Sequence, residues 1–264
     1  FECDVPLVFA AGLLVVLASL HYWLSLQMWL CASKKSLDEL GGSEQDTTLA
    51  PDSDELGGSN KTWEWDELGG SELEATLAPD PAPVRLLNAE FIVELAEGGG
   101  LMKRRQDLPE RAFTPFTTLR KMGPGGGGAA FLECLRIIVV SHPWLQPDHP
   151  DPRGDNLRLL ARVLKNYLAS GGPYAVFLDF MSLHQKERTL KEEDLFRLAL
   201  GGLSPWYSHP KTIVFKITHL PENYPNGFTF PPGTTPNIAN YFGRGWCFME
   251  SSVANLVKDS RLVL

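Results

Sequence analysis

The sequence predicts an α/β fold, with a parallel sheet flanked by helices behind one transmembrane helix and an extended acidic tether. Three observations predict it: a long uncharged apolar run near the N-terminus, an acidic Gly/Ser-rich stretch, and apolar runs that then alternate with helix-patterned segments. This alternation is typical of parallel strands joined by crossover helices. We divide the chain into a transmembrane helix (5–32), a tether (36–81), a basic, Gly-rich connecting region (82–130) and an α/β domain (131–264).

The first element is the run from Val5 to Ala32, which contains no charged residue. About 20 apolar residues cross the roughly 30 Å core of a bilayer. A signal peptide would instead start with basic residues and carry a shorter apolar stretch. Lys34 and Lys35 follow the run, so the positive-inside rule places the C-terminal body on the cytoplasmic, stromal or matrix side. We expect a single-pass integral protein of an organelle membrane, thylakoid or mitochondrial inner.

His21 lies near the middle of this span. An imidazole in hydrocarbon is costly and needs a partner, so we expect one continuous helix with His21 turned toward protein or a cofactor. The partner is either a hydroxyl or carbonyl group on a neighbouring helix or the metal of a haem or chlorophyll.

The tether is acidic and built from duplicated sequence. Asp-Glu-Leu-Gly-Gly-Ser occurs at 38–43, 54–59 and 66–71, and Thr-Leu-Ala-Pro-Asp occurs at 48–52 and 76–80. Such a composition buries too little apolar surface to offset the entropy lost on ordering. We expect it to lie extended against other protein, with little helix of its own and with Trp63 and Trp65 as anchors.

The connecting region allows several interpretations. Residues 84–95 fit one short helix, and 123–128 (Gly-Pro-Gly-Gly-Gly-Gly) fit a hinge, because a phosphate loop would follow a strand and end in Gly-Lys-Ser/Thr. A loose basic group could bind anionic lipid headgroups or the acidic tether, or could form a solvated surface. It comprises Lys103, Arg104, Arg105, Arg111, Arg120 and Lys121.

In the α/β domain, continuous apolar runs predict buried strands at 135–140, 174–179 and 212–217, with a fourth beginning at 261. Helix-spaced apolar residues predict helices from Asp155, at about 190–200 and at 246–257, the first of them capped by Asp155 or Asn156. The predicted core includes Ile137, Val139, Val176, Leu178, Ile213 and Phe215.

Four segments of this domain carry a resemblance. They are Val139–Trp144 (VVSHPW), His149–Gly154 (HPDPRG), Phe177–Leu183 (FLDFMSL) and Arg244–Glu250 (RGWCFME). Together they resemble a divergent TIR-like (Toll/interleukin-1 receptor-like) domain over residues 131–264, of a kind found in unicellular algae and other protists. The resemblance implies a TIR/flavodoxin-like fold, here truncated at its fourth strand. The loop after the second strand and the long 221–237 insertion depart from the family pattern.

The resemblance also implies a candidate catalytic residue. In TIR domains that cleave NAD, a glutamate in the last motif carries catalysis, and Glu250 is the matching position. Trp246, Val253 and Val257 share its helical stripe, and an apolar setting would raise the pKa of this carboxyl group. A salt bridge of Glu250 with Arg244, or with a cation on a neighbouring strand, is the structural alternative.

Nucleotide-facing residues would be Ser141, His142 and Trp144, because open α/β sheets bind ligands at the carboxyl ends of their strands. Asp179 ends the second strand at the same edge. Cysteine and histidine spacings fit neither a disulfide scaffold nor a metal site. We expect no NAD-cleaving activity, with Glu250 paired to a cation or a backbone donor and no open cleft reaching Ser141 and Trp144.

Two functions therefore compete. The first is an accessory or scaffold subunit of a larger membrane complex, which uses the TIR-like domain as a non-catalytic interaction module. The second is a membrane-anchored TIR-like signalling protein or NAD-cleaving enzyme. The expected partners are other membrane-protein subunits and the lipid bilayer, and no nucleic acid.

Overall fold

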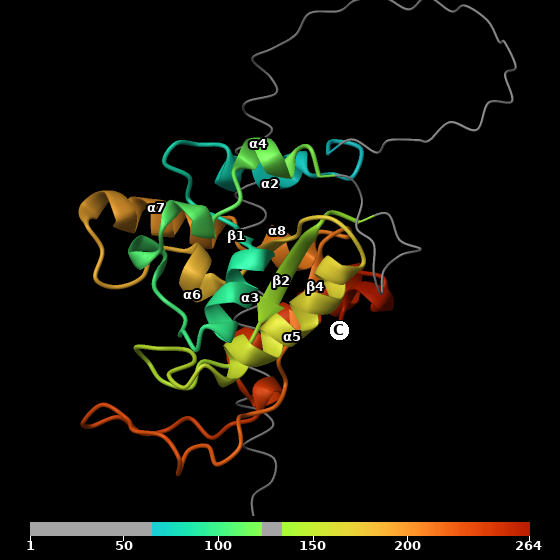
Figure 1. The fold of residues 1–264 in the computed structure, drawn as a ribbon. Helices are drawn as coiled ribbons and strands as arrows, with labels where there is room; N and C mark the ends of the chain where they lie inside the picture. The colour runs from blue at the N-terminus through green and yellow to red at the C-terminus, as the bar shows by residue number, and fades with distance from the viewer. Residues whose placement is uncertain (1–64, 123–133) are drawn as a thin grey trace, which may run out of the picture. The chain divides into compact units, whose positions relative to one another are not determined.

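The computed structural model describes residues 65–122 and 134–264, which form a mixed four-stranded sheet with helices on both faces (Figure 1). The strand order is β1-β3-β2-β4. The central strand β2 pairs in parallel with both β3 and β4, whereas the edge strand β1 pairs antiparallel with β3. The strands are Leu87–Asn88 (β1), Ile137–Ser141 (β2), Ala175–Phe177 (β3) and Ile213–Lys216 (β4).

Helices and short 3-10 turns connect these strands. The α-helices are Ser71–Leu77 (α2), Ala89–Glu97 (α3), Phe116–Leu119 (α4), Asp155–Ala169 (α5), Asp179–Ser182 (α6), Leu190–Gly201 (α7), Ser204–Ser208 (α8) and Gly245–Val257 (α9). The 3-10 turns are Arg105–Asp107 (η1), Glu110–Ala112 (η2), Tyr241–Gly243 (η4) and Ser260–Leu262 (η5).

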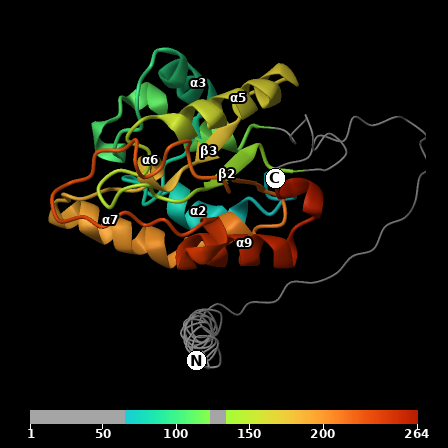
Figure 2. The same ribbon diagram turned by 90° about the horizontal axis from the view of Figure 1, so that it is seen from below.

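The sheet separates two hydrophobic cores. Ile138 and Val140 of β2 point to the core shared with α3 and α5, and Ile137 and Val139 point to the core shared with α2, α8 and α9. Figure 2 shows α3 and α5 on one side of the strands and α2, α7 and α9 on the other. Because both faces are covered, β2 is apolar at every position but its last.

The predicted strands and most of the predicted core are confirmed. Five of the six predicted core residues are buried, while Phe215 is only partly buried against the α3/α5 core. The strands of residues 131–264 pair in parallel, as predicted, but the connecting region adds the antiparallel edge strand β1, so the sheet as a whole is mixed. At the end of the chain, Val263 forms an isolated parallel bridge with Val214, where a fourth strand was expected to begin.

The connecting region belongs to the same fold. Instead of one helix over residues 84–95, the structure has β1 followed by α3, whose N-cap Asn88 accepts a hydrogen bond from the Glu90 amide at 2.8 Å. Leu87 and Ile92 are buried in the α3/α5 core. A strand of two residues is too short to show an alternation of apolar and polar residues. For this reason the sequence suggested only a helix here.

The described end of the tether also folds. Residues 71–77 form α2, and Leu73 and Leu77 are buried, so the expectation of an extended segment fails there. Trp65 is buried as well, with its ring edge-on to Phe116 at 6.1 Å between centroids. The indole therefore anchors this chain's own core rather than a partner.

The predicted helices of the α/β domain are confirmed as α5, α7 and α9. The predicted cap of α5 is wrong: its N-cap is Gly154, in the left-handed region with φ of 74°, and the Leu157 amide donates to Asp151 at 2.8 Å instead. Helix α7 begins with a capping box, in which Thr189 and Glu192 bond each other's backbone amides.

Several predictions fall outside the described residues. They are the membrane span at 5–32 with His21, the anchor Trp63 and the hinge at 123–128. Within residues 65–122 and 134–264, no helix is long and apolar enough to cross a membrane.

Candidate functional site

The carboxyl end of β2 meets α9 in a buried chain of hydroxyl and carboxyl groups. Ser141 is the last residue of β2 and follows Ile137 and Val139 on the side that faces α9. Its hydroxyl donates to Glu250 of α9 and shares a hydrogen bond of 2.6 Å with the Tyr241 hydroxyl of η4. The sequence-predicted residues Ser141 and Glu250 are thus in direct contact.

Burial raises the pKa of Glu250 to about 7, and the negative charge of Asp179 adds to this rise. The hydrogen bond from Ser141 acts in the opposite direction because it favours the carboxylate. Glu250 is only 2% exposed. The predicted rise in pKa is confirmed, with burial as its largest cause. The predicted apolar stripe is only part of that buried setting, since Trp246 and Val257 are half exposed.

A second group of polar residues joins the carboxyl ends of β2 and β3. Asp179 accepts hydrogen bonds from the Trp144 indole at 2.8 Å and from the Phe180 amide at 2.6 Å, and its other contact is His142 Nε2 at 3.3 Å. Burial opposes ionisation of both partners, yet their hydrogen bond and opposite charges raise the pKa of His142 and lower that of Asp179. The contact therefore favours the charged forms of both groups, imidazolium and carboxylate.

The alternative salt bridge of Glu250 with Arg244 is not formed. The Arg244 guanidinium donates to three backbone oxygens, those of Ala239 at 2.9 Å, Asn237 at 2.6 Å and Trp144 at 2.5 Å. The expectation of a cation or backbone donor at Glu250 is therefore wrong, because hydroxyl groups take that place. Arg244 instead fixes the end of the 221–237 insertion to the loop after β2.

A cavity of about 220 Å³ lies beside this cluster, between the loop after β2 and the insertion. Trp144 and Arg244 line it, but Ser141 and Glu250 do not. The Glu250 carboxyl group therefore does not line this cavity.

The basic group of the connecting region is mostly engaged in internal contacts. Arg105 is buried, and its guanidinium donates to the carbonyl oxygens of Ala82 and Pro83, both at 2.6 Å, and of Ser182 at 3.3 Å. Burial, with the nearby charge of Arg85, lowers the pKa of Arg105 to about 10. Arg120 lies 3.4 Å from Asp66 and 3.6 Å from Glu74, so one arginine does contact the acidic tether.

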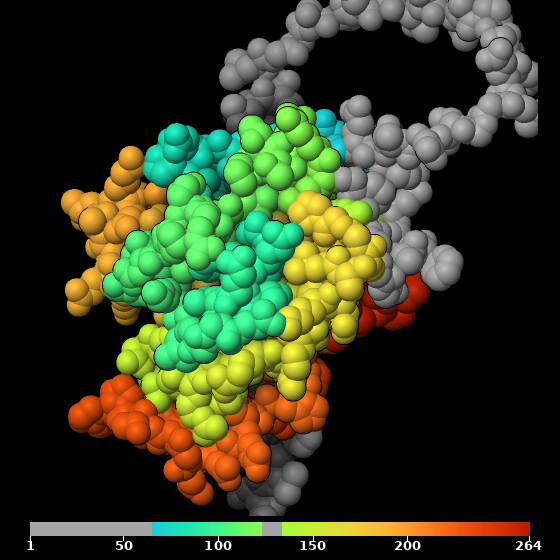
Figure 3. All heavy atoms as spheres, viewed as in Figure 1, coloured from blue at the N-terminus to red at the C-terminus, as the bar shows by residue number. Residues whose placement is uncertain are grey.

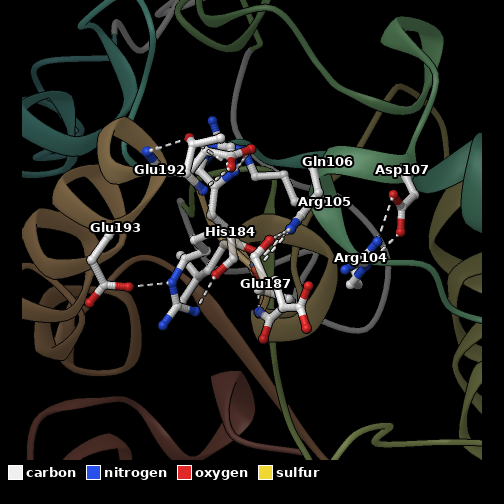
Figure 4. Close-up of polar contacts among 12 residues, drawn as sticks. Arg104, Arg105, Gln106, Asp107, His184, Glu187, Glu192 and Glu193 are labelled. Carbon is white, nitrogen blue, oxygen red and sulfur yellow. Dashed lines mark hydrogen bonds and ion pairs between the residues drawn. The ribbon is translucent and has the colours of Figure 1, made fainter.

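Figure 4 shows how η1 holds the segment between α6 and α7. Gln106 donates to the Gln185 carbonyl at 2.7 Å and accepts from the Gln185 amide at 3.1 Å. Arg104 pairs with Asp107 at 2.7 Å and donates to the Lys186 carbonyl at 3.0 Å. These contacts fix the loop between α6 and α7.

Burial and the Arg105 charge lower the pKa of His184 to about 4, so this imidazole is neutral near pH 7.

Two residues with buried polar contacts were not singled out from the sequence: Tyr241, which contacts Ser141, and Lys258, which lies at the other end of α9. Tyr241 lies nine residues before Glu250 and just before the Arg244–Glu250 segment. Its closeness to that segment is the only sequence signal that could have pointed to it. Lys258, just after α9, is buried, and its ammonium donates to the Thr212 carbonyl at 2.9 Å and hydroxyl at 2.7 Å. Lysine is usually exposed, so no sequence signal indicates this role.

Comparisons of the chain with protein-family models, with curated proteins and with solved structures find no match. The candidate site therefore has to be interpreted from its own geometry.

Proposed function

We propose that the chain is a membrane-anchored accessory or scaffold subunit whose α/β domain is a non-catalytic interaction module. The observation that carries the proposal is the outer face of α9. Leu256 is 82% exposed, Phe248 is about half exposed on the same outer side, and Trp246 and Val257 are about half exposed at the edge of the buried side. Apolar side chains gathered on one solvent-facing helix are typical of a surface that binds another protein.

The inner face of the same helix supports this assignment. Ser251, Ala254 and Cys247 are buried with Glu250 against the sheet and α8, so α9 is firmly seated on the domain. The only charged side chain in α9 is Glu250, which points inward. The exposed side of α9 thus carries no charge, although Asn255 and the partly exposed Ser252 are polar, and desolvating it on binding carries no ionic penalty.

One observation favours the enzymatic alternative. A carboxyl group with a pKa near 7 is suited to general acid–base chemistry, and Glu250 is the residue that the TIR-like resemblance marks. Against it, catalysis requires contact with the substrate, and both Glu250 and its partner Ser141 are buried and hydrogen-bonded to each other. We therefore rank NAD cleavage second.

Membrane anchoring rests on the apolar run of residues 5–32. A single span brings the domain to the membrane surface, where α9 can meet the soluble part of a neighbouring subunit. The partner in this proposal is another membrane protein, and the domain supplies the contact surface.

Leu256→Ser tests the interaction surface. In native gels of membranes solubilised with a mild detergent, the wild-type chain should migrate within a larger assembly, and Leu256→Ser should shift it to a smaller species. Leu190→Ser on α7 is the matched control, because Leu190 is 88% exposed and lies on another helix. Equal migration of all three proteins would count against α9 as the contact surface.

The enzymatic alternative has its own measurement. Purified chain is incubated with NAD, and release of nicotinamide is followed. We expect no release. Release by the wild type that Glu250→Ala abolishes would place the enzyme first.

A further inference from the structure

The surface made by residues 223–257 carries no exposed charged side chain. This stretch spans most of the insertion, all of η4 and all of α9, and the structure describes every residue of it. Its only charged residues are Arg244 and Glu250, which are 9% and 2% exposed. Charged residues make up 21% of the whole chain, so the lack of an exposed one over this length is a property of this surface.

Three large apolar side chains emerge from this uncharged surface near the start of α9. Ile238 is 71% exposed, Phe242 is 57% exposed and Trp246 is 50% exposed. They follow one another at intervals of four residues, across the end of the insertion, η4 and the first turn of α9. We call these three residues the neutral tip.

Buried polar residues hold the neutral tip in place. The Arg244 guanidinium donates to the carbonyl oxygens of the two residues that flank Ile238, at 2.6 and 2.9 Å. Tyr241 is buried and hydrogen-bonded to Ser141 at 2.6 Å. The ring of the next residue, Phe242, lies outside and edge-on to Tyr241, with 5.0 Å between centroids. The exposure of these apolar side chains is therefore set by the fold.

The insertion that ends at the neutral tip is itself folded. Tyr224 lies edge-on to Phe228 at 5.1 Å and to Phe230 at 6.0 Å between ring centroids, and its hydroxyl donates to the Leu145 carbonyl at 3.0 Å. Figure 3 shows the insertion, in orange, projecting from the lower end of the described domain. No residue of the neutral tip lines the 220 Å³ cavity beside the insertion. The tip thus belongs to a firm projection and not to the wall of that cavity.

We propose that the neutral tip inserts into the headgroup interface of the bilayer that holds residues 5–32, an inference that rests on the membrane anchor of the proposed function. Tryptophan is enriched at membrane interfaces, and apolar side chains gain free energy by leaving water. Burying a charge there would be costly, and this surface exposes none. A fluid bilayer can close around a projection, whereas a protein partner would need a matching hollow.

The anchor keeps the bilayer within reach of the neutral tip. Residues 33–64 connect the apolar run to the described domain, and a chain of that length spans at most about 110 Å. Insertion of the tip is then an intramolecular event, so three side chains of modest individual affinity suffice.

Insertion of the tip leaves the partner surface of α9 free. The helix starts beside Tyr241 and Ser141 and ends at Lys258, which donates to the Thr212 hydroxyl before β4. Ten residues of helix separate the start of α9 from Leu256, a distance of about 15 Å. A bilayer at the tip and a partner subunit at Leu256 can therefore be bound together.

An environment-sensitive fluorophore at the neutral tip tests the proposal. The full chain is reconstituted at one copy per lipid nanodisc, with Cys3 and Cys31 replaced by serine and the label attached at Ile238→Cys. The other two cysteines are buried. Lipids with a nitroxide in the headgroup region should quench this label. The matched control carries the label at Leu190→Cys on α7, which is 88% exposed and should not be quenched.

Phe242→Asp, added to the chain labelled at position 238, should reduce quenching about threefold or more, because a carboxylate resists leaving water. Phe242 is more than half exposed, so the fold should be retained, and circular dichroism checks this. Asn255→Asp is the matched control: it adds the same charge to an exposed residue near the other end of α9 and should leave quenching unchanged.

Three results would each overturn the proposal: no quenching at position 238, equal quenching at positions 238 and 190, or quenching that Phe242→Asp does not change. Carbonate extraction of membranes that hold the same chain separates this failure from failure of the anchor. A chain that resists extraction but shows no quenching at position 238 is anchored without insertion of the tip, whereas complete extraction removes the anchor on which the inference rests.

Discussion

Two carboxyl groups near the carboxyl edge of the sheet have pKa values that move in opposite directions. Glu250 is surrounded by hydroxyl groups and apolar atoms, so burial dominates and raises its pKa to about 7. Asp179 receives N–H donors from Trp144 and Phe180 and faces His142, so its pKa falls below the ordinary value despite burial. The difference between the pKa values of Glu250 and Asp179 therefore comes from the kind of hydrogen-bond donor each receives, and not from burial alone.

The titration of Glu250 should appear in the pH dependence of stability. Since its pKa is 4.5 unfolded and about 7 folded, the folded chain binds more protons between these values, and stability falls as pH rises through them. The wild-type free energy of unfolding should drop by about 3 kcal/mol between about pH 4.5 and pH 8 from this group. Glu250→Gln still accepts from Ser141 but cannot ionise, so urea unfolding should show a smaller drop. Parallel pH profiles of the two proteins would contradict this.

Asp179→Ala should destabilise the fold by about 3 kcal/mol, because it removes the counter-charge of a buried imidazole and an acceptor of the Trp144 indole. Asp194→Ala on α7 is the control, since Asp194 is exposed and has no contact with the cluster. Urea denaturation at about pH 6 gives both values, a pH at which His142 is protonated in the folded chain. A loss no larger than that of the control would show that the cluster contributes little.

At the scale of elements, the third copy of the repeat shows how a tether-like sequence can fold. Gly70 comes so close to the Trp65 indole that a Cβ atom would lie 2.2 Å from Cε2. Gly69 has φ of 77°, a conformation that favours glycine, and its carbonyl contacts His209 at 2.9 Å. The Gly-Gly pair of the repeat is thus what lets the chain turn tightly around Trp65 and enter α2.

Gly70→Ala should therefore cost about 2 kcal/mol, as expected when a methyl group is forced into a packed site. Gly201→Ala is the matched control: it ends α7, a Cβ atom there meets nothing within 4 Å, and alanine favours the helix. Thermal unfolding of the two variants should give shifts of opposite sign. A Gly70 variant as stable as the wild type would show that Trp65 can move aside.

The predicted elements, set beside those of the structure, show what sequence patterns can and cannot predict. Strands β2, β3 and β4 and helices α5, α7 and α9 were predictable, because long apolar runs and helical spacing report burial directly. Strand β1 has two residues and gives no pattern, and its pairing partner β3 lies almost 90 residues away in sequence. Likewise, the position of Glu250 was predictable, but its contacts with Ser141 and Tyr241 depend on the packing of three elements.

At the scale of the whole molecule, the two proposed contact surfaces lie at opposite ends of α9, the neutral tip at its start and Leu256 near its end. The exposed side of α9 is uncharged, and the α3/α5 face carries a cavity whose walls hold both cations and carboxylates. The contacts with a bilayer and with a partner subunit are therefore both proposed for α9 and the segment before it. Both proposals concern the described domain, whereas the proposed membrane anchor is the apolar run of residues 5–32.

The last prediction concerns that run. Leu17 lies near its centre, and a lysine there costs about 3 kcal/mol of insertion free energy, so Leu17→Lys should weaken membrane integration markedly. The wild-type chain should stay in the membrane pellet after alkaline carbonate extraction, and more of the variant should appear in the supernatant.

Thr47→Lys is the control, because Thr47 lies in the acidic tether, where an added charge meets water. Protease added from the side of Lys34 and Lys35 should digest the C-terminal body, as the positive-inside rule requires. Complete extraction of the wild type by carbonate would exclude a spanning helix. The contact proposed for α9 would then have to form without a membrane anchor. Carbonate extraction therefore tests both the predicted membrane span and the proposed function that depends on it.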